Sequence, residues 1–141
     1  MDSYLLPTDI ALVVVKHPAS GDSGNGKVIC NEVVKKLASH HGPVCIFHDA
    51  SDMLSADAGY AEEFKNLSVV LAERVRECVC VIPLLAPRIM ALAVAKASGR
   101  KWTIFKSTAE AVNHLHSLGA DIGHLRMYSG SVAVKRMEKA A

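Results

Sequence analysis

Short aliphatic runs that alternate with longer amphipathic segments constrain this chain more than any other feature. Three runs, Ile10–Lys16, Val44–His48 and Val79–Leu85, are aliphatic almost without interruption, as strands buried on both faces of a parallel sheet are. Trp102–Lys106 predicts a shorter fourth strand. Because parallel strands need helical crossovers, the pattern predicts an α/β fold: a four- or five-stranded, mostly parallel mixed sheet flanked by about four helices.

Helical periodicity follows each of these runs. The predicted helices are Lys27–His40, Ala58–Glu77, Pro87–Ser98 and Ser107–Leu118. Ser107 and Glu110 have the spacing of a capping box at the start of the last helix. A chain of 141 residues has the size of one domain. We expect this domain to span residues 1–119 and the remainder, 120–141, to be a loosely ordered C-terminal tail, although residues 131–135 have some strand character.

Charge and hydropathy exclude two classes of partner. The formal net charge of +2 is too small to favour nucleic acid or an anionic membrane surface. The apolar run from Cys78 to Ala97 contains Pro83, Pro87 and Arg88 near its middle. Because a central arginine costs about 2.5–3.5 kcal/mol in a bilayer, we expect no membrane span, and no signal-peptide pattern opens the chain.

The cysteines predict a reducing, cytoplasmic environment. All four lie inside apolar segments: Cys30, Cys45, Cys78 and Cys80. The spacing of Cys78 and Cys80 differs from the C-x-x-C spacing of metal and redox sites. We therefore expect buried free thiols and neither a metal nor a cofactor.

One stretch, Val44–Tyr60, draws attention as a site. A buried strand there passes into a loop of Asp, Ser, Ala and Gly residues that precedes the longest predicted helix. The carboxyl ends of strands in open α/β sheets, and the helices that start there, are where ligands usually bind. The candidate partner- or ligand-docking residues are His48, Asp49, Ser51, Ser55, Asp57, Gly59, Tyr60 and Arg88.

The same stretch resembles the anti-sigma-factor antagonist (STAS) family, in particular its SpoIIAA-like branch. The family's pattern of Asp-x-Ser-x-Val followed by Asp-Ser-Ser-Gly-Leu is matched by Asp49-x-Ser51-x-Met53 and by Asp57-Ala58-Gly59-Tyr60. A second similarity follows along the chain: an apolar helix ending in Ser98-Gly99, an aromatic strand Trp102–Phe105, and Glu110-Ala111 in the final helix. The resemblance covers about residues 40 to 118.

The resemblance implies a bacterial, cytoplasmic, non-enzymatic regulatory module with a STAS-like fold. Its partner would be another protein, with self-association into a homodimer and a small apolar or anionic ligand at the strand ends as further expectations. Regulatory members of the family are switched when a partner kinase phosphorylates a serine of the Ser-Ser-Gly segment. Ala58 stands at a serine position here, which leaves Ser51 and Ser55 as the alternative acceptors.

A glycine-rich segment supports a competing interpretation. Residues 21–27 match the phosphate-loop pattern G-x-x-x-x-G-K between a predicted strand and a predicted helix. The candidate phosphate-binding residues are Gly21, Gly24, Gly26 and Lys27. Val28 occupies the position of the hydroxyl that would hold Mg²⁺. The alternative function is therefore a nucleotide-binding protein that does not hydrolyse its ligand.

Polar residues gather at the predicted carboxyl ends of the strands. His17, His48 with Asp49, Arg88, and Lys106 with Ser107 would share one edge of the sheet. Such a cluster suits anion binding or acid–base chemistry, but no nucleophile stands beside His48 and Asp49, so we assign no catalytic residue. His40-His41 and His114-x-His116 lack the spacing of a helical metal site and are interpreted as solvated.

Overall fold

The chain forms a five-stranded mixed sheet, which confirms the predicted α/β fold class. The computed structural model describes residues 10–99, 102–118 and 132–136. The strand order across the sheet is β6-β5-β3-β1-β7. The first four are parallel and β7 is antiparallel to β1. Their bounds are β1 Ala11–Lys16, β3 Val44–Asp49, β5 Val75–Val81, β6 Trp102–Phe105 and β7 Val132–Arg136.

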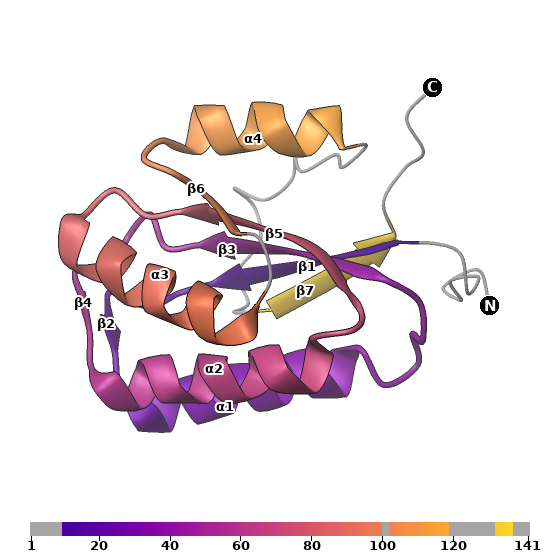
Figure 1. The fold of residues 1–141 in the computed structure, drawn as a ribbon, viewed down its shortest axis with the longest axis horizontal. Coiled ribbons are helices and arrows are strands. Elements are labelled where there is room, and N and C mark those ends of the chain that lie inside the picture. Colours follow the sequence, from indigo (N-terminus) through magenta and orange to yellow (C-terminus); the bar gives the residue numbers. More distant parts are fainter. Residues whose placement is uncertain (1–9, 100–101, 119–131, 137–141) are drawn as a thin grey trace.

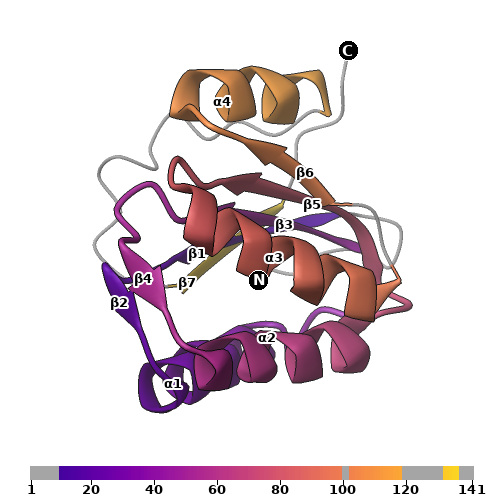
Figure 2. The ribbon, with the colours of Figure 1, turned by 60° about the vertical axis from the view of Figure 1, so that its left-hand side comes forward.

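Three helices cover one face of the sheet and one helix covers the other (Figure 1). The helices are α1 Ser23–Lys36, α2 Ala58–Leu71, α3 Leu85–Ser98 and α4 Thr108–Ser117. Because β1, β3, β5 and β6 are neighbours in chain order, crossovers of one hand place α1, α2 and α3 on the same side. α4 follows the edge strand β6 and packs on the opposite face, as Figure 2 also shows.

Side-chain alternation along the strands divides the core into two. Val13 and Val15 belong to the larger core beneath α1, α2 and α3, whereas Leu12 and Val14 belong to the smaller core beneath α4. The predicted inner faces of the helices are confirmed as buried. They comprise Ile29, Val33 and Leu37 of the first, Phe64, Leu67 and Leu71 of the second, and Ala111 and Leu115 of the last, whereas Leu118, also predicted on that last inner face, is exposed.

A two-residue ladder lies beside the carboxyl ends of the sheet strands. Ser20–Gly21 forms β2 and Ser55–Ala56 forms β4, and the two pair in parallel. The backbone of Ala19 also accepts hydrogen bonds from the amides of Leu54 and Ser55. The loops that follow β1 and β3 are therefore tied together, and this holds the starts of α1 and α2 next to each other (Figure 2).

The second helix is shorter than the sequence predicts. It ends at Leu71, and Val75, Arg76 and Glu77 belong to β5, which was expected only from Val79. The sequence extends the apolar stripe of the predicted helix through Val75, because a buried residue at that position fits a helical periodicity as well as a strand periodicity. The Arg74 guanidinium donates to the backbone carbonyls of His40 and Gly42 and so fixes the turn before β5.

Part of the expected loose tail is a strand of the sheet. Residues 132–136 form β7, and Val132 and Val134 pack on the larger core while Ala133 packs on the smaller one. The alternation of these side chains therefore matches the pleat of β1. The other residues of the expected tail, 120–131 and 137–141, lie outside the described residues.

Two histidines expected in solvent are instead wholly or partly buried. His40 is only 3% exposed, and its Nε2 bonds the carbonyl of Pro43 at 3.1 Å. His114 Nε2 lies 2.9 Å from Glu77 Oε1 on β5, whereas His116 is exposed as expected. The partner of His40 lies across a turn and the partner of His114 lies on a distant strand. Helical spacing alone reveals neither partner.

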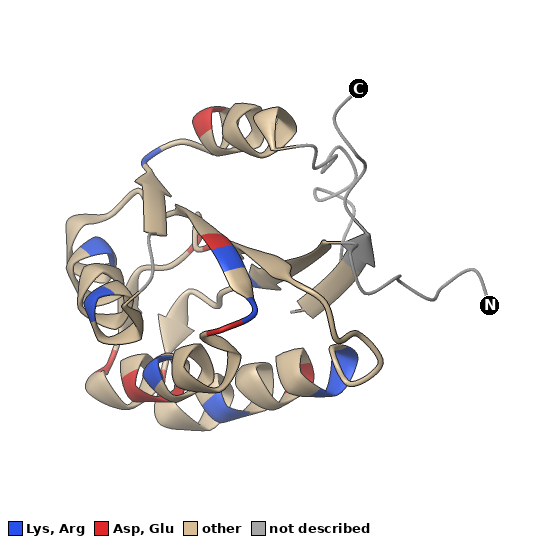
Figure 3. Ribbon diagram, turned by 45° about the vertical axis from the view of Figure 1, so that its right-hand side comes forward, with Lys and Arg blue, Asp and Glu red and all other residues tan. Residues whose placement is uncertain are grey.

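Surface charge and thiols follow the sequence expectations. In the view of Figure 3, acidic and basic residues are interspersed rather than gathered by sign, in keeping with the net charge of +2. All four cysteines are buried and unpaired. Among the described residues, no helix is both long and apolar enough to cross a membrane.

Candidate functional site

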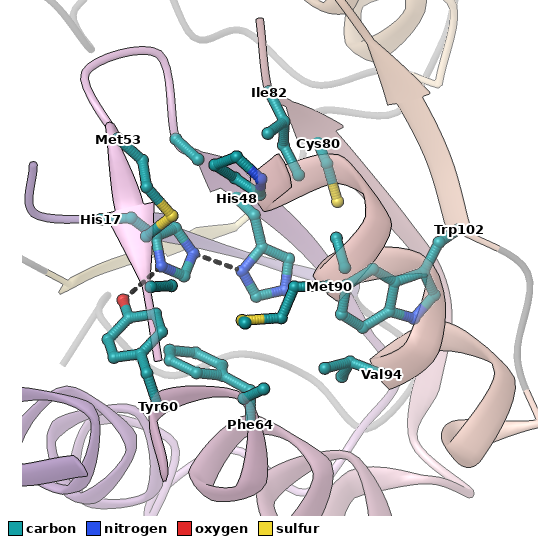
Figure 4. A pocket seen from close by; sticks show the side chains of 15 residues that line it. His17, His48, Met53, Tyr60, Phe64, Cys80, Ile82, Met90, Val94 and Trp102 are labelled. Atoms are coloured by element: carbon teal, nitrogen blue, oxygen red, sulfur yellow. Dashed lines mark hydrogen bonds between the residues drawn. The ribbon is translucent and has the colours of Figure 1, made fainter. Parts of the chain in front are cut away.

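A cavity of about 50 Å³ opens at the carboxyl ends of the strands, between the sheet and helices α2 and α3. Figure 4 shows the side chains that surround it. His17, His48 and Trp102 come from the sheet side, Tyr60 and Phe64 from α2, and Met90 from α3. The remaining wall is aliphatic or sulfur-bearing, so its polar groups are the two imidazoles, the Tyr60 hydroxyl and the indole N–H of Trp102.

The polar groups of this wall form a single hydrogen-bonded chain. The Tyr60 hydroxyl lies 2.5 Å from His17 Nδ1, and His17 Nε2 lies 2.9 Å from His48 Nδ1. All three side chains are buried. His48 Nε2 has no hydrogen-bond partner among the described residues and is turned toward Met90 and Trp102 (Figure 4).

The direction of the chain follows from the buried hydroxyl. His17 is the only described hydrogen-bond partner of the Tyr60 O–H, and a buried donor left unpaired costs about 1–3 kcal/mol. The hydroxyl therefore donates to His17 Nδ1. His17 then carries its proton on Nε2 and donates to His48 Nδ1, so His48 carries its proton on Nε2. His48 thus presents its Nε2–H to the cavity as a donor.

Burial keeps both imidazoles neutral. Desolvation lowers the pKa of His48 from 6.5 to about 4. The pKa of His17 is lowered well below 6.5 by desolvation and, secondarily, by the neighbouring His48. Burial also raises the pKa of the Tyr60 hydroxyl, which therefore stays protonated. At neutral pH the three groups form an uncharged donor chain in an apolar wall.

Aromatic contacts fix the orientation of His48. Its ring stacks on the Trp102 indole, with centroids 5.1 Å apart and planes 21° apart. Phe64 meets the same imidazole edge-on at 5.8 Å and lies 5.0 Å from the His17 ring. Rings packed in this way leave little freedom to turn, so the donor of His48 points in a defined direction.

The glycines of the phosphate-loop pattern make room for Tyr60. A Cβ at Gly21 would lie 2.8 Å from the Tyr60 ring, and one at Gly26 would lie 3.0 Å from it. Side chains at these two positions would displace the ring that donates to His17. The two glycines therefore have a packing role that accounts for their spacing without a phosphate.

The start of α1 also differs from a phosphate loop. Asp22 caps the helix by accepting from the Asn25 amide at 2.8 Å, and Asn25 Oδ1 accepts from the Asp22 amide in return. Gly24, Gly26 and Lys27 are helical. A carboxylate thus occupies the position where a phosphate would bind, and this arrangement gives little support to the nucleotide hypothesis.

The acidic loop of the sequence prediction is mostly engaged in local structure. Asp49 accepts from the amide and hydroxyl of Ser51, at 3.1 and 2.6 Å. Asp57 caps α2 by accepting from the Tyr60 amide at 2.8 Å. Ser55 is exposed in β4, with its hydroxyl 3.4 Å from that of Ser20.

Two more predicted docking residues lie apart from the cavity wall. Gly59 packs against α1, because a Cβ there would lie 2.8 Å from Ser23 Cβ. Arg88 is half-buried in α3, and its Nε is a buried donor without a partner in the part of the chain that the structure describes. Of the predicted docking residues, only His48 and Tyr60 line the cavity.

Sequence reasoning placed His17 beside His48 but did not include it, or the aromatic wall, in the site. Phe64 was interpreted as ordinary core, and Trp102 as part of a strand. The available signal was the alternation of the strands, which places His17 and His48 on the same face as Val15 and Ile46. Met90 carried no signal, because α3 is apolar on nearly all sides.

Comparisons with known proteins add no assignment. No family model, no curated protein and no solved structure matches this chain. Among the described residues, no group of three or more His, Cys, Asp or Glu side chains is placed to hold a metal ion. The site must therefore be interpreted from its own geometry.

Proposed function

We propose that this chain is a non-enzymatic regulatory module that binds a small, neutral, apolar ligand in the cavity at its strand ends. The ligand carries one hydrogen-bond acceptor, and His48 Nε2–H donates a hydrogen bond to it. The single observation that carries the proposal is the Tyr60–His17–His48 chain, which ends in an unpartnered donor within a largely apolar wall. Apolar pockets with a few oriented polar groups are typical of small-molecule sites.

The charge state of the wall favours a neutral ligand over an anionic one. Both imidazoles have lowered pKa values, so neither supplies a positive charge at neutral pH. An anion buried there would lose its hydration without an ionic partner, which is costly. A carbonyl or ether oxygen loses less and regains one hydrogen bond.

The groups of the wall do not favour catalysis. Burial raises the pKa of the Tyr60 hydroxyl and of the Cys80 thiol, so neither is an activated nucleophile. His48 presents a proton rather than a lone pair to the cavity. These features suit binding, in line with the non-enzymatic role that the resemblance to anti-sigma-factor antagonists implies.

Helix α3 supports the regulatory part of the proposal. Its inner side chains Met90 and Val94 line the cavity, while Leu85, Ile89 and Leu92 on the same helix are exposed. Exposed apolar groups of this kind are typical of protein-interaction surfaces. A ligand that contacts α3 from inside would therefore act on a surface available to another protein.

A fluorescence titration tests the binding proposal. Trp102 is the only tryptophan of the chain and lies in the cavity wall, so its emission reports occupancy. We expect 2-heptanone to change the emission saturably and heptanoate and ATP to leave it unchanged. The variant His48→Phe should weaken 2-heptanone binding about tenfold, the value of one hydrogen bond near 1.4 kcal/mol.

A matched variant controls for the exchange of a histidine. His116→Phe makes the same change at an exposed position of α4 that lines no cavity. Its affinity for 2-heptanone should equal that of the unmodified chain. Binding of heptanoate or ATP in preference to the ketone, or no saturable response to any of the three, would contradict the proposal.

A further inference from the structure

A second, smaller cavity adjoins the first. It measures about 10 Å³ and lies beneath the carboxyl-terminal half of α2, where Ser68, Leu71 and Cys78 line it. His48, Phe64 and Trp102 belong to the walls of both cavities. These three rings are therefore common to the walls of both spaces, and His48 is the imidazole of that shared wall.

The two spaces differ in what they hold. A cavity needs about 10–15 Å³ of internal volume to hold one water-sized group. The larger cavity therefore holds roughly three to five such groups and the smaller one about a single group. A ligand that occupies both has one long arm and one short arm, with its polar atom between them at His48.

The donor of His48 selects the chemistry of that polar atom. A carbonyl oxygen accepts the N–H and brings no proton of its own, whereas a hydroxyl would bring a second donor into an apolar wall. A buried donor without a partner is costly. The trigonal carbon of a ketone also sends its two substituents in different directions, which suits two spaces that share His48 in their walls.

We propose, resting on the proposed function above, that the ligand class is a small aliphatic ketone or similar carbonyl compound with unequal arms. The long arm occupies the larger cavity, a methyl or ethyl arm occupies the smaller one, and the carbonyl oxygen accepts from His48 Nε2. Neither the resemblance nor the larger cavity by itself specifies this shape.

Positional isomers of one ketone test the inference without changing the composition of the probe. 2-Heptanone has arms of one and five carbons, and 4-heptanone has two arms of three. Each buried methylene is worth about fourfold in affinity. We expect 4-heptanone to bind at least about tenfold more weakly in the Trp102 titration, and 2-heptanol to bind several-fold more weakly than 2-heptanone.

A variant that fills the smaller cavity tests the position of the short arm. Ser68→Leu adds carbon atoms at the wall of that cavity from a half-buried helical position. We expect this variant to bind 2-heptanone at least about fivefold more weakly, the order of one methyl group. Asn66→Leu is the matched control on an exposed position of α2 that lines neither cavity, and it should leave the affinity unchanged.

The outcomes separate this inference from the proposed function. If both isomers bind equally and Ser68→Leu has no effect, the two-armed ligand is wrong, while binding that His48→Phe weakens still supports the proposed function. If 2-heptanol binds as well as 2-heptanone, the carbonyl assignment is wrong. If no ketone binds, both proposals are wrong.

Discussion

His17 and His48 stand 31 residues apart in the chain and share a 2.9 Å hydrogen bond between their rings. The bond exists because β1 and β3 are parallel neighbours whose side chains alternate in step. It couples the phenol at the start of α2 to the cavity beside Trp102.

Removing the first donor of the chain should destabilise the protein. Tyr60→Phe leaves His17 Nδ1 without the hydroxyl that now donates to it. Because the nitrogen is buried, we expect a loss of about 1–3 kcal/mol in the free energy of unfolding, measured by urea denaturation. Asn66→Leu, on the exposed face of the same helix, serves as the control. A loss below about 0.3 kcal/mol would show that the hydroxyl bond is not formed.

Stability should fall as the pH is lowered from about 6.5 toward 4. Burial lowers the pKa of His48 to about 4 in the folded chain, and the pKa of His17 is also lowered. In this window the unfolded chain binds protons that the folded chain does not, so each histidine contributes a slope of up to about 1.4 kcal/mol per pH unit.

The histidine contribution can be isolated by difference. Denaturation curves between pH 4 and 7.5 should show a shallower slope for His48→Phe than for the unmodified chain, whereas Asn66→Leu, which changes no titratable group, should retain the original slope. Because carboxylates contribute equally to all three chains, the comparison removes them. Parallel curves for all three chains would mean that the buried imidazoles are protonated in the folded state.

Alanine substitutions at the glycines of the phosphate-loop pattern should differ in their effect on stability. Gly21→Ala places a Cβ 2.8 Å from the Tyr60 ring, and overpacking of this kind costs about 1–3 kcal/mol. At Gly24 the nearest atom is an oxygen of the Asp22 carboxylate at 3.3 Å, which has to move by only a few tenths of an ångström, so Gly24→Ala should cost less than Gly21→Ala. Thermal unfolding of the two variants measures the difference. Equal effects would argue against the packing role of Gly21.

The wall of the smaller cavity also contributes to stability. Leu71 is 3% exposed and lines that cavity at the end of α2. Truncation in Leu71→Ala should cost about 2–5 kcal/mol, measured by urea denaturation. Val70→Ala, on the exposed side of the same helix, should cost less than about 0.5 kcal/mol. A small loss at Leu71 would place that face of α2 in solvent.

A test of protein docking at the acidic loop needs conservative changes. Charge reversal at Asp57 or a bulky residue at Gly59 would be the direct test of two predicted docking residues, provided that the fold stayed intact. Asp57 caps α2, and Gly59 contacts Ser23, so both changes would also disturb the fold. Asp57→Asn keeps a capping side chain while removing the charge. The free energy of unfolding of this variant should lie within about 0.5 kcal/mol of that of the unmodified chain. If the loop is the docking face, the variant should bind a protein partner more weakly.

The core strands and the buried faces of the helices could be predicted from the sequence, because long aliphatic runs and regular apolar periodicity are unambiguous. Val44–His48 and the inner face of α2 show this, since burial and periodicity agree there. The end of α2 was not accessible, because Val75 fits a helical stripe as well as a strand. Strand character at residues 131–135 did not outweigh the expectation of a loose tail, because the edge strand Val132–Arg136 has only a short alternating pattern and gains its stability from β1.

The site was only partly accessible for a different reason. The sequence placed His17 near His48, but the hydrogen bonds of the chain depend on Tyr60, which comes from a separate element. The glycines that admit its ring matched a phosphate-loop pattern, and that match drew the interpretation toward nucleotides. Close approach of a ring to a backbone has no sequence signature of its own.

The central claim is that His48 offers an N–H to a ligand in an apolar cavity. Long-range ¹H–¹⁵N spectra of the histidine side chains at pH 7 test it most directly, because they distinguish the two neutral tautomers from the cation. We predict that His17 and His48 are both neutral with the proton on Nε2, and that 2-heptanone shifts the Nε2 resonance of His48 more than that of any other histidine. A protonated or Nδ1–H form of His48, or a spectrum unchanged by the ketone, would contradict the account.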